Sequence, residues 1–481
     1  MRQDEYVAAD GLELANRVRT GEVDAAGVMA ACRERIASLN PELNAVIAVI
    51  DPPQEASERR DAPFLGVPFL MKDIGAGVKD VPTVAASRYF LNSDSPGDDA
   101  LTTRFRAAGL RIVGKTSLPE LGFNVTTEPS LYGPTCNPWD VTRTAGGSSG
   151  GAAAAVASGM VPIAHATDGA GSIRIPAACC GLVGLKPSRG VVPLGPRFTD
   201  VYGGLVSEGV VSRTVRDTAA ALDACGGEDD GAPYASPLGR SSSLSLELRM
   251  PARRLRIGLV GKPPPDVDLS PEVVAGVDRA AAMLASLGHQ VARLDLPFTD
   301  AELLVPRQVY KAHVCVQSAT DRRDEAERGR RPRAGDLERI NVAAAARGSA
   351  MAAVDFVAVV RRGHEFARRL SRVWDGCDVL LSAALSELPP PLGRFPTDHD
   401  DVDLHVDRMA RFAPFASLFN LSGGPAIVLP VALSTGGLPI AVQLGGPLGR
   451  DGEILQLAAE LEAAVTAEGY PAHRLAPMAL A

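Results

Sequence analysis

Residues 143–174 read RTAGGSSGGAAAAVASGMVPIAHATDGAGSIR and contain two serine sites set among small residues. Ser148 lies within Gly-Gly-Ser-Ser-Gly-Gly, and Ser172 follows Asp-Gly-Ala-Gly. A serine hydroxyl becomes a good nucleophile only when a neighbouring group takes its proton. The stretch therefore raises the question of which side chain could be the base.

The first serine site precedes a segment that favours a helix. Ala152–Ser158 is rich in alanine, whereas Asp140–Ala145 lacks the apolar character of a buried strand. The nucleophile elbow of α/β-hydrolases, Gly-x-Ser-x-Gly, requires such a strand directly before it. The glycines therefore indicate a close-approach loop at a helix N-terminus, with a plain Gly/Ser loop as the alternative.

The second serine site offers the backbone of an oxyanion hole, because small residues before Ser172 let several N–H groups point into one space. The nearest histidine, His165, follows the apolar run Val161–Ala164, and we expect it to be structural. Lys72 is another candidate base, since it follows the apolar run Phe64–Met71. Desolvation at the end of a buried strand lowers the pKa of a lysine and favours its neutral form. A salt-bridged lysine at the edge of the core is the alternative.

Short apolar segments alternate with helical patterns along the 481 residues. This alternation is typical of an α/β protein with a buried sheet. The expected strands include Ala45–Ile50, Phe64–Met71 and Arg111–Val113, and the expected helices include Asp99–Ala108 and a helical region from Gly11 to Leu39 that stops at Asn40-Pro41.

Composition excludes several classes of protein. The formal net charge of −8 argues against nucleic acid or an anionic membrane as the main partner. Seven scattered cysteines without a C-x-x-C pair, together with an N-terminus that lacks a signal-peptide pattern, predict a cytoplasmic protein. No H-E-x-x-H motif and no His/Cys cluster occurs, so we expect no metal.

Taken together, the separated motifs resemble the amidase signature family. They occur in the order of that family: Phe64–Asp73, Gly146–Gly151, Asp168–Ala177 and Cys180–Pro187. Thr135–Asp140 is similar to the family's lead-in, and Phe419–Ala426 and Gly437–Leu444 are similar to its last core segments. The resemblance therefore extends across much of the chain.

The resemblance implies a Ser-cisSer-Lys triad in which Ser172 is the nucleophile, Ser148 the bridging serine and Lys72 the base. It also implies a cis peptide bond between Gly147 and Ser148. The proton would pass from Ser172 through Ser148 to a neutral lysine, and water would then hydrolyse the acyl-enzyme. No cofactor is needed for this chemistry.

The same resemblance implies roles for neighbouring residues. The oxyanion would bind backbone N–H groups of Gly169, Ala170, Gly171 and Ser172. Asp168 and Arg174 are expected to brace this turn through charge-assisted hydrogen bonds. Ser149 and Thr167 are expected to support the triad.

For the fold, the family implies a single α/β/α domain over residues 1–481, with a large mixed sheet covered by helices on both faces. We expect a signature core at about 60–215 and a variable region around the substrate pocket at about 298–403. The charged segment Arg322–Arg333 lies in that region. We expect it to be a solvated helix face or a loop, and a lid over the pocket is the alternative.

Within the family, the chain is most similar to the branch that contains 6-aminohexanoate-cyclic-dimer hydrolase. That similarity rests on Thr126–Pro129, on the Ala-Gly-Ser form of the nucleophile turn and on Val314-Cys315. It implies a hydrophobic, aryl or cyclic amide as substrate, with Cys315 and Tyr132 as candidate substrate contacts. A small buried residue on a helix is the alternative for Cys315.

Two other activities use the same triad and stay open. One is the A subunit of a tRNA-dependent amidotransferase, which would need partner subunits. The other is an acyltransferase that excludes water from the acyl-enzyme. The expected partner is a small-molecule amide, without nucleic acid or membrane, and a homodimer is also open.

Overall fold

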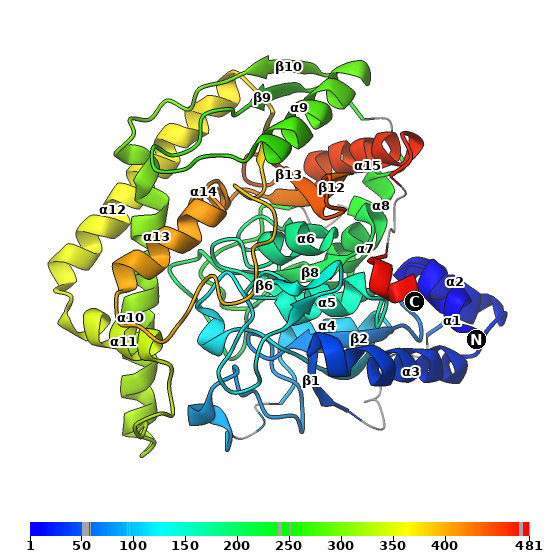
Figure 1. Ribbon diagram of the computed structural model, residues 1–481, viewed down its shortest axis with the longest axis horizontal. Helices are drawn as coiled ribbons and strands as arrows, with labels where there is room; N and C mark the ends of the chain where they lie inside the picture. The colour runs from blue at the N-terminus through cyan, green and yellow to red at the C-terminus, as the bar shows by residue number, and fades with distance from the viewer. Residues whose placement is uncertain are drawn as a thin grey trace.

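The computed structural model of the protein describes residues 1–50, 57, 59–93, 95, 97–238, 243–250, 252–470 and 475–480 (Figure 1). Within them, eleven strands form one sheet, in the order β1-β3-β2-β6-β8-β7-β12-β13-β11-β9-β10. The sheet is mixed: β3, β2 and β6 run parallel, as do β11, β9 and β10, while the strands between these groups pair antiparallel.

The strands of this sheet are short and come from the whole length of the chain. Their bounds are β1 Val46–Val49, β2 Pro68–Lys72, β3 Arg111–Thr116, β6 Ile163–Asp168, β7 Val183–Lys186, β8 Ser207–Ser212, β9 Arg256–Leu259, β10 Gln290–Arg293, β11 Val379–Ala383, β12 Ala426–Leu433 and β13 Pro439–Gly445. A separate two-stranded ribbon is formed by β4 Cys136–Asn137 and β5 Asp140–Thr144.

Helices cover the sheet and extend beyond it. Their bounds are α1 Gln3–Ala8, α2 Gly11–Thr20, α3 Ala25–Leu43, α4 Ala100–Ala107, α5 Gly150–Ala157, α6 Arg174–Cys180, α7 Val215–Cys225, α8 Leu244–Glu247, α9 Pro271–Ser286, α10 Val305–Glu327, α11 Arg339–Ala350, α12 Ala353–Leu370, α13 Val402–Phe412, α14 Ala416–Ser422 and α15 Asp451–Ala467. Helices α10 to α13 gather on one side of the molecule, on the left in Figure 1.

Both faces of the central strands are buried. Every residue of β2, β7, β8, β11 and β13 is buried, and alternate side chains of a strand point to opposite faces of its sheet. A strand can be buried throughout only if both faces are covered. The predicted α/β/α layering with a large mixed sheet is therefore confirmed.

Most of the elements expected from the sequence form near their predicted bounds. The three expected strands correspond to β1, β2 and β3, and the expected helices at Asp99–Ala108 and Ala152–Ser158 correspond to α4 and α5. The segment before the first serine site does form a strand, β5, although it belongs to the separate two-stranded ribbon and not to the central sheet.

The predicted helix stop at Asn40-Pro41 is wrong. Helix α3 continues through Pro41 to Leu43 and ends at Asn44, which has a left-handed backbone conformation. The Asn40 side chain accepts hydrogen bonds from the N–H groups of Ala45 and Val46, so it fixes the exit from the helix one turn later. The helical region is also divided earlier, where Gly21 ends α2 in a left-handed conformation.

Among the described residues, no single helix is long and apolar enough to cross a bilayer. One pair of helices, Arg339–Ala350 and Ala353–Asp375, meets the length and composition requirement together but is bent by 103°.

Helix α5 begins in very close contact with the backbone of two other segments. A Cβ atom on Gly151 would lie 2.5 Å from the Ser117 nitrogen and 2.6 Å from the Ala45 oxygen. Neither backbone atom can move aside as a flexible side chain would. Gly151, the second residue of α5, therefore allows the helix to pack against the residues that flank β1 and β3.

We expect the Gly151→Ala variant to lose about 1–3 kcal/mol of unfolding free energy, because the added methyl group overpacks this contact. Chemical denaturation followed by circular dichroism measures the change. Gly436→Ala is the matched control, since its Cβ would meet no atom closer than 3.8 Å. Equal stability of the two variants would contradict the packing argument.

Candidate active site

Lys72 ends strand β2 with its side chain completely buried. Its Nζ donates to three hydroxyl oxygens: Ser148 Oγ at 2.7 Å, Ser149 Oγ at 2.8 Å and Thr167 Oγ1 at 2.9 Å. No carboxylate pairs with Lys72 within the described part of the chain. The alternative of a salt-bridged lysine instead fits Lys115, whose Nζ lies 3.4 Å from the buried Asp73 carboxylate.

Burial sets the protonation of Lys72. It lowers the pKa of the amine to about 7, although the charges of Glu208 and Asp168 act in the opposite direction. A substantial fraction of neutral amine is therefore present at neutral pH. A lysine in this state can accept a proton.

Ser148 reaches Lys72 from the loop before α5. The peptide bond between Gly147 and Ser148 is cis, as the sequence comparison implied. Gly147 lies against the backbone of Thr126, where a Cβ would come within 2.7 Å of the Thr126 oxygen. The Ser149 N–H donates to the Ser172 carbonyl oxygen at 3.3 Å, which joins the two serine sites.

The turn that carries Ser172 is held by Asp168, at the end of β6. The Asp168 carboxylate accepts from the Gly171 N–H at 2.7 Å and from the Ile173 N–H at 3.2 Å. The N–H groups of Gly169, Ala170 and Ser172 have no acceptor among the residues that the structure describes. These three donors are the part of the turn available to an oxyanion.

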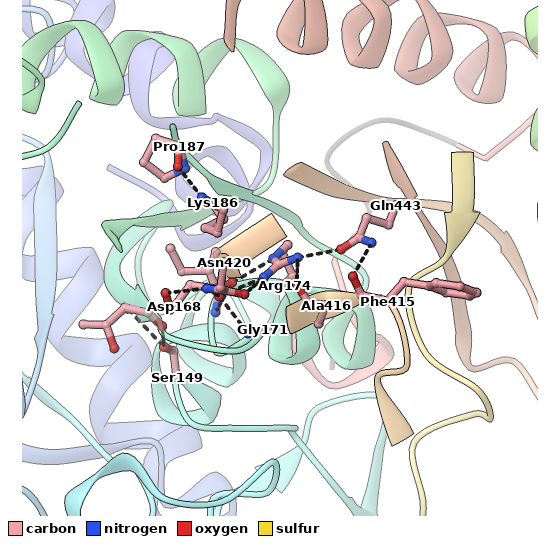
Figure 2. Close-up of polar contacts among 12 residues, drawn as sticks. Ser149, Asp168, Gly171, Arg174, Lys186, Pro187, Phe415, Ala416, Asn420 and Gln443 are labelled. Carbon is pink, nitrogen blue, oxygen red and sulfur yellow. Dashed lines mark hydrogen bonds and ion pairs between the residues drawn. The ribbon is translucent and has the colours of Figure 1, made fainter. Parts of the chain in front are cut away.

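Arg174 pairs with Asp168 through two hydrogen bonds, from Nε and Nη2, each 2.9 Å long (Figure 2). Both side chains are buried. Burial favours the neutral form of Asp168, but the guanidinium outweighs it and holds the pKa of this carboxyl well below its usual value. The pair is a bidentate ion pair beside the turn that carries Ser172.

Segments far along the chain complete this ion-pair site. Arg174 also donates to the Ala416 carbonyl at 2.8 Å, to Gln443 Oε1 at 2.7 Å and to Asn420 Oδ1 at 2.7 Å. The Asn420 amide returns a hydrogen bond to Asp168 Oδ1 at 2.9 Å. Helix α14 and strand β13 thus hold the turn between β6 and α6, as Figure 2 shows.

His165 lies behind Lys72 rather than beside a serine. Its Nδ1 accepts the backbone N–H of Lys72 at 3.2 Å, so the proton of the neutral ring resides on Nε2. That nitrogen lies 2.6 Å from Glu208 Oε2, on the neighbouring strand β8. Both ring nitrogens of His165 therefore make structural contacts, one with the Lys72 backbone and one with Glu208.

A cavity of about 680 Å³ opens over Ser148 and Ser172. Thr167 and Gly169 line its floor beside the serines, and aromatic side chains line its walls. These aromatic residues are Tyr89, Phe90, Phe123, Phe198, Tyr202 and Tyr310. The cavity is large enough for a small organic molecule.

The structure brings most, though not all, of the predicted site residues together. Ser148 and Ser172 line the same cavity but are not hydrogen-bonded to each other. Cys315 is buried on α10, where its neighbour Val314 faces the cavity instead. Tyr132 lies outside the cavity lining, and its carbonyl accepts from the Asn44 amide at 2.8 Å.

Several residues of the site were not predicted from the sequence. Glu208 could have been noticed in the sequence, because it is the one charged residue in the segment Val206–Val211, which is otherwise made of valine and small residues. Tyr202 had none, and Tyr310 was covered only by the broad pocket region expected at about 298–403, because the two residues come from a loop and a helix that meet only in the fold. No group of three or more His, Cys, Asp or Glu side chains in the described chain could hold a metal ion.

Known proteins that are similar in sequence support the family resemblance of these motifs. The family profile described as "Amidase" matches residues 27–455. The 6-aminohexanoate-cyclic-dimer hydrolase of Pseudomonas sp. is 36% identical over 476 residues, which are 95% of this chain and 94% of that protein. The putative amidase AmiC of Mycobacterium bovis is 36% identical over 463 residues, which are 95% of this chain and 94% of that protein.

A solved structure extends the comparison to the fold. The structure of 6-aminohexanoate cyclic dimer hydrolase complexed with substrate has a TM-score of 0.89 and 32% sequence identity. The match covers 98% of this chain and 99% of that chain. The sequence, the fold and the family profile agree, and this chain belongs to the amidase signature family of amide hydrolases.

Proposed function

We propose that this protein hydrolyses a small-molecule carboxamide through an acyl-enzyme on Ser172, with Ser148 as proton relay and Lys72 as base. The observation that carries the proposal is the 2.7 Å contact between Lys72 Nζ and Ser148 Oγ, at the floor of a cavity that also contains Ser172. A buried amine whose pKa is about 7 can take up and return a proton near neutral pH.

Acylation begins when the neutral Lys72 amine takes the proton of Ser148, which takes the proton of Ser172. The Ser172 oxygen attacks the amide carbonyl, and the new C–O bond leaves a negative charge on the carbonyl oxygen. The N–H groups of Gly169, Ala170 and Ser172 are positioned to stabilise this charge. The two hydroxyls must approach to hydrogen-bonding distance when substrate binds.

The tetrahedral intermediate collapses when the C–N bond breaks. The proton held on Lys72 returns through Ser148 to the departing amine, which would otherwise be a poor leaving group. Water then attacks the ester, and the same residues carry its proton to Ser172. Asp168 and Arg174 act by holding the backbone of the turn, without touching the reacting atoms.

The aromatic walls of the cavity support a hydrophobic, aryl or cyclic amide as the substrate. Tyr310 lies between Phe123 and Tyr202, with ring centroids 6.5 Å and 6.1 Å away. A relative whose name specifies a cyclic dimer of 6-aminohexanoate supports the same class.

The proposed activity is tested by release of amine or ammonia from a panel of aliphatic, aryl, cyclic and peptide amides, with glutamine included. We expect aryl or cyclic amides to be turned over by the wild type and not by Ser172→Ala. Turnover of glutamine alone would favour the amidotransferase subunit. Transfer to an added amine without hydrolysis would favour an acyltransferase.

The roles of Lys72 and His165 predict opposite outcomes for their variants. Lys72→Ala should lower kcat by about 10²–10⁴, because it removes the base. His165→Asn should keep most of kcat, because the asparagine oxygen can still accept the Lys72 N–H. Steady-state kinetics on one anilide measures both, and a large loss only in the histidine variant would contradict the proposed proton route.

The pKa of Lys72 predicts the pH dependence. Only the neutral amine accepts a proton, so kcat/KM should rise with pH through a midpoint near 7. Glu208 and Asp168 supply the negative charges that favour the ammonium form. Glu208→Gln removes one of them while a glutamine oxygen can still accept from His165, so the midpoint should move to lower pH.

Glu327→Gln is the control for this shift, because Glu327 is an exposed carboxylate outside the cavity lining. Its midpoint should equal that of the wild type. A midpoint that stays fixed or rises in Glu208→Gln would show that Lys72 does not govern the acid limb.

A further inference from the structure

One face of helix α10 forms a wall of the cavity. Five of its lining residues follow helical spacing, four, three, one and three positions apart, and form a single stripe: Tyr310, Val314, Gln317, Ser318 and Asp321. The C-terminal part of the helix adds Arg322, Asp324 and Glu325 to the lining. The eleven steps from Tyr310 to Asp321, at a rise of about 1.5 Å each, extend about 16 Å along the helix axis. The stripe is aromatic and apolar at its first end and polar at its second.

The first end lies beside the nucleophile turn. The Tyr202 ring is 6.1 Å from that of Tyr310, and a Cβ on Gly169 would lie 3.6 Å from Tyr202 Cδ2. Tyr310 is only 8% exposed, yet its hydroxyl has no partner among the described residues. Burial raises the pKa of this phenol well above its usual value, so it stays protonated and can hydrogen-bond to a ligand.

The second end of the stripe carries the Asp321 carboxylate, next to Arg322, which also lines the cavity. Asp321 accepts from Gln317 Nε2 at 2.7 Å, and no arginine, lysine or histidine pairs with it in the described chain. Asp200, from the loop after β7, also lines the cavity and accepts only the Gly204 N–H, at 2.6 Å. Asp321 is open to solvent because it faces the cavity.

The arginines that line the cavity form no ion pair with Asp200 or Asp321 in the described part of the chain, and several of them bind other groups. Arg328 and Arg330 both pair with Glu325, at 2.9 Å and 2.5 Å. Arg197 donates to the Gly75 carbonyl, and Arg322 forms no ion pair with Asp200 or Asp321. Desolvation by the surrounding protein raises the pKa of the Asp321 carboxyl, and the negative charges of Asp324 and Glu325 raise that pKa further. A bound cation would relieve this repulsion.

We propose that the cavity selects elongated amides that carry a protonated amino group, with the scissile carbonyl at Ser172, an apolar chain along Tyr310 and Val314, and the ammonium at Asp321. Asp200 lines the same cavity and contributes a second negative charge to it. Aromatic faces and a carboxylate together recognise ammonium groups through cation–π and ionic contacts. This inference rests on the proposed amide hydrolysis and specifies its substrate.

Two matched anilides test the inference: 8-aminooctananilide and nonananilide, which differ by an ammonium in place of a methyl group. The measured quantity is the ratio of their kcat/KM values. We expect Asp321→Asn to lower the amine:methyl ratio about tenfold, the usual effect of losing one charged hydrogen bond. Asp200→Asn should lower it less, and the exposed control Glu327→Gln should keep the wild-type ratio.

An unchanged ratio in Asp321→Asn would overturn the assignment of Asp321 even if both anilides are hydrolysed. Raising the salt concentration should reduce the wild-type ratio, because screening weakens an accessible ion pair. A ratio that does not respond to salt would likewise contradict an ionic contact.

A binding measurement separates this inference from the proposed function. Titration calorimetry of 8-aminooctananilide and nonananilide uses Ser172→Ala, in which no acyl-enzyme can form on Ser172. Tighter binding of the amine to Ser172→Ala than to Ser172→Ala/Asp321→Asn would support the ammonium site even if the wild type hydrolysed neither anilide. Equal binding would overturn it, whatever the activity.

Discussion

Desolvation of the Lys72 amine is the constraint on which the rest of the site depends. An ammonium in water would hold its proton near neutral pH, and the serine hydroxyls would have no base. At the end of an entirely buried strand, surrounded by three hydroxyls and no paired carboxylate, the same amine has a pKa of about 7. The segments that carry Ser148, Ser149 and Thr167 bring hydroxyl groups to this amine.

The Asp168–Arg174 pair explains why distant segments are needed to build so small a site. A buried ion pair is costly unless its remaining hydrogen-bonding groups are satisfied. Here Ala416, Asn420 and Gln443 satisfy them, so α14 and β13 must reach the turn after β6 before the pair can form. The turn that carries Ser172 is therefore held by distant segments as well as by the local hydrogen bonds of Asp168.

The sequence predicted the core better than the walls of the site. Lys72, Ser148 and Ser172 stand in motifs whose glycines and apolar runs have local physical reasons, and those segments fold as expected. Tyr202, Tyr310 and Asp321 could not be found in this way, because a loop and a long helix acquire a shared function only when they pack together. The helix stop at Pro41 failed for a different reason: local hydrogen bonds from the Ala45 and Val46 N–H groups to the Asn40 side chain place the helix end after Pro41.

The proposed proton route is tested most directly by identifying the residue that becomes acylated and by measuring the rate of that acylation. The protein is reacted with an activated ester such as a p-nitrophenyl alkanoate, quenched, digested and analysed by mass spectrometry at several pH values. We expect an acyl group on Ser172, formed at a rate that rises through pH 7 and that is almost abolished in Lys72→Ala. Acylation of another residue, or an undiminished rate in Lys72→Ala, would contradict the proposed route.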